Sequence, residues 1–231
     1  MIVTTGNITQ GEANRLSRAS RFASPLWEGG DTEPWILEAM TGLLLASGQR
    51  IVLELGGYHG AGSVALAQTL DRLGCPYRHL VVVEYDPALA ALVTQSLVES
   101  GTTTSYTVVC RDSLEALDTL DDRSIGFAWV DDSHDTPHVM AEMERLIPKM
   151  VDGGIICFHD VCGSYRLHAV VDLYGGLSLH LPRVSNSGGL GILQVRPSTR
   201  TRMIPVPYWE PHEVGPGEVH VNVFGTDDEP V

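Results

Sequence analysis

Residues 51–60 read Ile51-Val52-Leu53-Glu54-Leu55-Gly56-Gly57-Tyr58-His59-Gly60, and this stretch decides the fold. A short apolar run ends in a glycine-containing loop. The segment that follows, residues 61–73, has leucines at helical spacing. A strand that passes through such a loop into a helix is typical of an open α/β sheet, in which ligands bind outside the carboxyl ends of the strands.

The same alternation continues along the chain. A first helix is expected from Asp31 or Thr32, which can cap it, with Pro34 in its first turn. Further helices are expected at residues 61–73, 87–99, 113–117, 137–150 and 167–174. Strands are expected at residues 51–55, 80–84, 106–110, 125–130, 154–158, 178–181 and 190–195. Near-continuous apolar strands between helices predict a doubly wound α/β fold with a seven-stranded, mostly parallel sheet.

The chain divides into three parts. Residues 1–30 are expected to form an irregular arm, residues 31–196 the α/β domain, and residues 197–231, rich in Pro, Gly and acidic residues, a C-terminal extension. The arm lacks the apolar segment of a signal peptide, and no apolar run reaches the roughly 18 residues of a membrane span. We therefore expect a cytoplasmic protein.

Charge excludes some functions. The net charge is −14, from 15 basic and 29 acidic side chains. Nucleic-acid binding depends on neutralising phosphates with Lys and Arg, so an extensive nucleic-acid surface is not expected. Lys149 is the single lysine, which leaves almost no candidate for Schiff-base chemistry.

The four cysteines are expected to be reduced thiols, mostly in the core: Cys75, Cys110, Cys157 and Cys162. They form no CxxC pair. The spacing of Cys157, His159 and Cys162 does not match the common structural zinc motifs.

Acidic residues mark the ends of the first three strands. Residues 54–60 lack the G-x-G-x-x-G pattern of a dinucleotide site, and Glu54 would repel a pyrophosphate but suits a cationic ligand. Glu84 is placed to accept two ribose hydroxyls. Asp112 and Ser113, after the third strand, can contact an adenine edge, although a helix N-cap explains them equally well.

Two further strands are followed by acids and histidines. Asp131 and His134 follow the strand at 125–130, and His159 and Asp160 follow the strand at 154–158. Neighbouring strands lie about 4.8 Å apart, so these side chains can converge at the mouth of a cleft. Such a cluster is typical of metal binding or acid–base chemistry.

Together these residues resemble the class I methyltransferases that use S-adenosylmethionine (SAM), over about residues 31–195. The resemblance implies that Glu54 and the glycine loop hold the amino-acid end of SAM and that Glu84 holds the ribose. Asp131 can face the sulfonium of SAM as an alternative to binding a metal. The full set of implied cofactor residues is Glu54, Gly56, Gly57, Tyr58, Gly60, Ser63, Glu84, Asp112, Ser113 and Asp131.

The D-x-x-H pattern at residues 131–134 resembles a narrower group, the macrocin O-methyltransferase-like and cephalosporin-hydroxylase-like enzymes, and more distantly catechol O-methyltransferase. That resemblance implies that Asp131, His159 and Asp160 bind Mg²⁺ and that His134 is the general base. Asp132 stands where a glycine is usual. A histidine ligand would favour Mn²⁺, Fe²⁺ or Zn²⁺, or a role behind the ligands, and a metal-free site is the alternative.

The expected activity is O-methylation of a hydroxyl on a small molecule, such as a natural product in biosynthesis, with a homo-oligomer left open. The alternatives are a metal-dependent hydroxylase on the same fold and a non-catalytic SAM-binding or oligomerisation module. Trp27, Trp35 and Tyr58 are expected at the cleft entrance. Four other histidines are expected to be surface residues without a catalytic role: His59, His138, His168 and His180.

Overall fold

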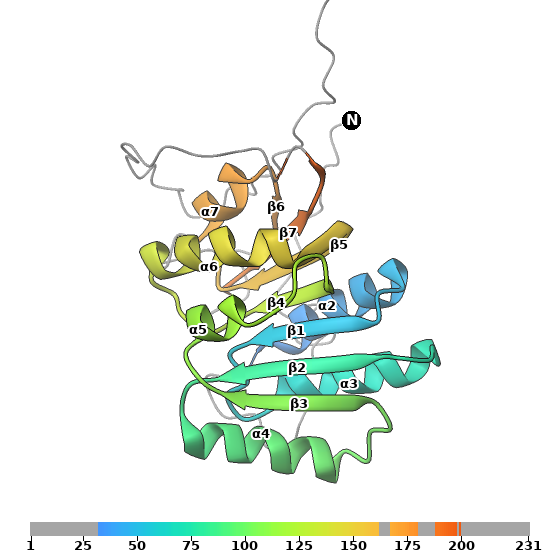
Figure 1. The fold of residues 1–231 in the computed structure, drawn as a ribbon. Coiled ribbons are helices and arrows are strands. Elements are labelled where there is room, and N and C mark those ends of the chain that lie inside the picture. The colour runs from blue at the N-terminus through green and yellow to red at the C-terminus, as the bar shows by residue number, and fades with distance from the viewer. Residues whose placement is uncertain (1–31, 162–166, 180–187, 198, 200–231) are drawn as a thin grey trace, which may run out of the picture.

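The computed structural model describes residues 32–161, 167–179, 188–197 and 199. These residues form one seven-stranded sheet in the order β3-β2-β1-β4-β5-β7-β6. Figure 1 shows the strands side by side, from β3 at the bottom to β6 and β7 at the top. The strands are β1 (Ile51–Leu55), β2 (His79–Glu84), β3 (Ser105–Cys110), β4 (Ile125–Val130), β5 (Met150–His159), β6 (Leu177–Leu179) and β7 (Leu190–Gln194).

The predicted fold class is confirmed. The first five strands run parallel to one another, and β7 pairs antiparallel with both β5 and β6. The order reverses beside β1, so the carboxyl ends of β1 and β4 meet at the switch point where open α/β sheets bind ligands.

Six helices in the described residues cover the two faces of the sheet. They are α2 (Pro34–Ser47), α3 (Ala61–Leu73), α4 (Pro87–Glu99), α5 (Ser113–Asp118), α6 (Thr136–Lys149) and α7 (His168–Leu173). Side chains of α2, α3 and α4 share one core cluster with Val52, Phe127 and Trp129. Side chains of α5, α6 and α7 share the other with Leu53 and Ala128, because alternate strand residues face opposite sides.

The start of α2 differs from the prediction. Its N-cap is Glu33, which makes no side-chain capping bond, and Pro34 occupies the first helical position as expected. Thr32 does not cap the helix, because its hydroxyl donates instead to Asp131, 99 residues away. Asp31, with the predicted arm and almost all of the C-terminal extension, lies outside the described residues.

The described cysteines are free thiols, as expected, but only Cys157 lies in the core, where it is fully buried. Cys110 is exposed and Cys75 half-buried, because they lie at the end of β3 and just after α3 rather than inside the core. Cys162 lies outside the described residues. None of the described helices is long and apolar enough to cross a membrane.

A pair of leucine substitutions tests this arrangement. Leu70→Ala on α3 removes a fully buried side chain and is expected to lower the free energy of unfolding by about 2 to 5 kcal/mol. Leu92→Ala on α4 is the matched control, because Leu92 is 42% exposed and its loss should cost roughly 0.5 kcal/mol or less. Urea unfolding measures both. Equal losses would contradict the placement of α3 against the sheet.

Candidate functional site

A cavity of about 790 Å³ opens at the carboxyl ends of β1, β2, β4 and β5. Its wall contains every cofactor, base and metal residue expected from the sequence except Gly60, which caps α3, and Ser63, which hydrogen-bonds Glu54. The lining residues named from the sequence are Glu54, Gly56, Gly57, Tyr58, Glu84, Asp112, Ser113, Asp131, His134, His159 and Asp160.

The glycine loop is shaped by close backbone packing. Gly56 has φ of 86°, and a Cβ there would collide with the carbonyl oxygen of Asp131. Gly60 has φ of 88° and would place a Cβ 2.8 Å from the Cβ of Ser96 on α4. Both positions therefore require glycine, and the first brings the loop against the end of β4.

Glu54 lies beneath this loop and is 1% exposed. The hydroxyl of Ser63 donates a short hydrogen bond to its carboxylate. Burial raises the pKa of Glu54 to about 8, so the group holds a proton at neutral pH until a cation approaches it. This behaviour suits the positively charged ligand that the sequence predicts.

Glu84 ends β2 and holds the loop in place. Its Oε2 accepts hydrogen bonds from the amides of Gly57 at 3.1 Å and Tyr58 at 2.9 Å, and its Oε1 accepts one from Asp86 at 2.9 Å. The side chain is 8% exposed, and it still reaches the cavity wall. The glycine loop and the Glu84 carboxylate are therefore held together by these hydrogen bonds.

Asp112 is the N-cap of α5, as one of the two sequence interpretations expects. It accepts hydrogen bonds from the amides of Leu114 and Glu115. The neighbouring Ser113 pairs its hydroxyl with Nε2 of His138 at 3.0 Å. Both Asp112 and Ser113 also line the cavity.

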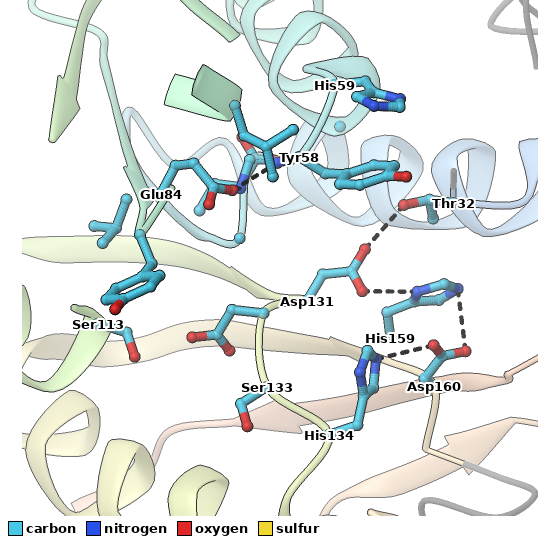
Figure 2. Close-up of a pocket in the computed structure, with 18 of the residues that line it drawn as sticks. Thr32, Tyr58, His59, Glu84, Ser113, Asp131, Ser133, His134, His159 and Asp160 are labelled. Carbon is cyan, nitrogen blue, oxygen red and sulfur yellow. Dashed lines mark hydrogen bonds and ion pairs between the residues drawn. The ribbon is translucent and has the colours of Figure 1, made fainter. Parts of the chain in front are cut away.

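The polar residues after β4 and β5 meet in one network (Figure 2). His159 places Nδ1 2.8 Å from Oδ1 of Asp131, and His134 places Nε2 2.9 Å from Oδ2 of Asp160. Oδ2 of Asp131 accepts from the Thr32 hydroxyl at 2.9 Å. Donor atoms of Asp131, His134 and Asp160 lie within 4.8 Å of one another.

The two histidines differ in charge because their partners differ. Burial alone would lower the pKa of His159, but the carboxylates of Asp131, Glu33 and Asp160 outweigh it and raise this pKa to about 11. The imidazolium is held at both nitrogens, so it positions Asp131 and has no lone pair to offer. The hydrogen bond to Asp160 raises the pKa of His134, and the pKa of Asp160 is lowered in return.

Sequence reasoning missed Glu33, whose carboxylate reaches His159 Nε2 at 2.6 Å and accepts from the Gly188 amide at 3.1 Å. No local pattern marks a residue that acts 126 positions away. It also missed Glu142, which is fully buried on α6. The signal for Glu142 is its spacing, since it falls four residues before Leu146 on the apolar face of the helix.

Two other predictions are corrected. His138 is not a surface residue, because it is half-buried, lines the cavity and pairs with Ser113 and Glu142. His59 is exposed, as expected, and it also lines the cavity and stacks on Tyr58, with ring centroids 3.8 Å apart. Trp35 packs against the core cluster of α2 and α3 and does not line the cavity. Trp27 and His180 lie outside the described residues.

Solved structures share this fold at low sequence identity. The cofactor-bound protein Rv0187 of MTB is 19% identical, with a TM-score of 0.59 over 80% of this chain and 88% of that one. The O-methyltransferase TomG of Streptomyces achromogenes, solved with SAM, is 18% identical, with a TM-score of 0.61 over 80% and 89%. The O-methyltransferase of Bacillus cereus, solved with S-adenosylhomocysteine (SAH), is 16% identical, with a TM-score of 0.60 over 84% and 94%. No curated protein matches this sequence.

The fold is the Rossmann-like fold of the class I methyltransferases, as the sequence resemblance implied. Residues 53–161, a little under half of the chain, match the family model described as methyltransferase domain. That range begins in β1 and ends just after β5, so it contains the glycine loop, Glu84 and the whole His–Asp network.

The charge of His159 predicts a pH dependence of stability. Its pKa is about 6.5 in an unfolded chain and about 11 in the folded one, so its stabilisation is complete below pH 6.5 and is lost as pH rises toward 11. The stability difference between wild type and His159→Gln should therefore shrink across that window, measured by urea unfolding of metal-stripped protein. The exposed-residue control, His59→Gln, should follow the wild type at every pH. A constant difference for His159→Gln would contradict the assignment.

Proposed function

We propose that this protein is a SAM-dependent O-methyltransferase that methylates a hydroxyl group of a small molecule. The observation that carries the proposal is the juxtaposition of the glycine loop and the His134–Asp160 pair in one cavity. One side of the cavity suits a cationic cofactor and the other supplies a base. Structures with SAM and with SAH bound to relatives of the same fold support this division.

The cofactor side is formed by Glu54, the loop at residues 56–60 and Glu84. SAM supplies a methyl group on a positively charged sulfonium, and displacement by an acceptor oxygen leaves the neutral thioether. Carboxyl groups beside the bound sulfonium would favour its charge, and Asp131, which lines the cavity at the end of β4, would supply one. The chain mainly holds the reactants in line, an effect that can be worth about 7 to 11 kcal/mol.

On the acceptor side, His134 takes the hydroxyl proton. A general base of this kind contributes roughly 10²- to 10⁴-fold in rate. The carboxylate of Asp160, 2.9 Å from Nε2, stabilises the imidazolium that results. His159 and Thr32 hold Asp131 from two sides, which keeps the wall between cofactor and acceptor rigid.

A second candidate is the metal-assisted form of the same reaction. The donors of Asp131, His134 and Asp160 lie within 4.8 Å of one another and fit a divalent cation. This set replaces His159, the ligand expected from the resemblance, because both nitrogens of His159 contact carboxylates. A bound cation would lower the pKa of the acceptor hydroxyl, and His134 would then be a ligand in place of a base.

The proposal also covers the chemical class of the methyl acceptor and the location of the enzyme in the cell. A natural-product hydroxyl is proposed because TomG, of the same fold, takes part in tomaymycin synthesis. We place the enzyme in the cytoplasm, acting on a small molecule. The hydroxylase alternative is separated by product analysis, since methyl transfer produces SAH and consumes no oxygen.

Calorimetric titration with SAH tests the cofactor site without any knowledge of the acceptor. Wild type should bind SAH at micromolar concentration, and Glu84→Gln should weaken binding at least tenfold, because Glu84 holds the loop. Glu99→Gln, an exposed change at the end of α4, is the control and should bind as wild type does. Absence of SAH binding by wild type would remove the proposal.

His134→Ala tests the base. Turnover with an acceptor found by screening hydroxylated compounds against labelled SAM should fall about 10²- to 10⁴-fold, with SAH affinity nearly unchanged. Because a base must be neutral, wild-type activity should rise with pH through the raised pKa of His134, and Asp160→Asn should move that rise to lower pH. Equal losses of turnover and SAH affinity would count against the base.

Loss of activity when the metal is removed would favour the metal-assisted form of the reaction.

A further inference from the structure

A second polar cluster lies on the α5–α6 side of the cavity. Asp132 comes from the loop after β4, Ser113 begins α5, and His138 and Glu142 face them from α6. The proposed methyl transfer uses none of these side chains except Ser113, at the edge of the cofactor region. The cluster therefore calls for its own explanation.

One ring nitrogen of His138 faces three oxygens. Nε2 lies 3.0 Å from the Ser113 hydroxyl, 3.3 Å from Oε1 of Glu142 and 3.9 Å from Oδ2 of Asp132. A tetrahedral ion with bonds of about 2.0 to 2.1 Å places its ligand atoms about 3.4 Å apart. The three distances scatter around that value, and donor atoms of Asp132, His138 and Glu142 all lie within 4.8 Å of one another.

Glu142 gives a second, independent observation. It is fully buried, and the polar groups that its carboxyl reaches all belong to this cluster: Asp132, Ser113 and His138. Oδ1 of Asp132 is also buried, with no hydrogen-bond partner among the described residues. The ion pairs of both carboxyl groups within the described residues are with His138. Buried carboxyl groups are costly, and proteins usually pair them or use them to coordinate metals.

A hydrolase-type triad does not explain the cluster. In a triad the nucleophile and the acid contact opposite nitrogens of the histidine. Here the Ser113 hydroxyl and the Glu142 carboxyl both face Nε2. The convergence of all three oxygens on one nitrogen is instead the arrangement expected around a central cation.

We propose that Asp132, His138 and Glu142 form a metal site for a divalent transition ion of the Zn²⁺ type, with Ser113 or water as the fourth ligand. One imidazole and two carboxylates favour such an ion over Mg²⁺, which prefers oxygen ligands alone. The ion would tie the loop that carries Asp131 and His134 to both α5 and α6. Its role is to position that loop, and it does not depend on the proposed methyl transfer.

Zinc content after equilibrium dialysis of metal-stripped protein tests the site. Glu142→Gln should retain one zinc ion per chain fewer than wild type. Glu144→Gln is the matched control, because Glu144 is exposed on the same helix, and it should retain the wild-type number. Asp160→Asn, which alters the other cluster, should keep the ion that Glu142→Gln loses.

Thermal unfolding gives a readout that does not require the Glu142 variant to fold. Zinc should raise the melting temperature of wild type and of Asp160→Asn, and His138→Gln should lose that rise. Equal zinc content in the Glu142 and Glu144 variants would overturn the proposal, as would the absence of zinc uptake by wild type. SAH titration in parallel reports on the cofactor site separately, so the two proposals can fail independently.

Discussion

The contact between the end of β1 and the end of β4 is the constraint on which the site depends. The amide of Asp131 donates to the carbonyl of Leu55 at 2.9 Å, and Gly56 follows with no side chain to separate the two segments. The residues that leave both strands therefore form one wall. Any larger residue at position 56 would clash with Asp131 and move the glycine loop away from it, which would change the shape of the cavity.

Concentrated negative charge is the second feature of this wall. Carboxyl groups from five strand ends line one cavity, and its basic lining residues are Arg111 and histidines. A cleft of one sign attracts ligands of the other, which suits a sulfonium and divalent cations. Each carboxyl is stabilised differently: Glu54 by a proton, Glu84 by backbone amides, and Asp131 and Asp160 by imidazole rings.

The histidines show how partners assign roles to identical side chains. His159 lies between two carboxylates, so its charge is permanent over the physiological range and it serves as a fixed support. His134 pairs with the carboxylate of Asp160, and the proposed reaction requires it to gain and lose a proton. His138 faces three oxygens through one nitrogen. The three imidazole rings are chemically identical, so the difference in their roles comes from the oxygen atoms around them.

The sequence by itself determined the alternation of strands and helices, the last two strands of the chain and the polar residues at the ends of β1, β2, β4 and β5. These features follow from local periodicity and from the geometry common to parallel sheets, so short stretches are enough to predict them. Only the tertiary structure decided that Glu33 supports His159, that Thr32 bonds Asp131 instead of capping α2, and that Glu142 is buried beside His138. Those contacts depend on how α2 and α6 dock against the sheet, which is set by packing between distant segments and leaves no local pattern to read.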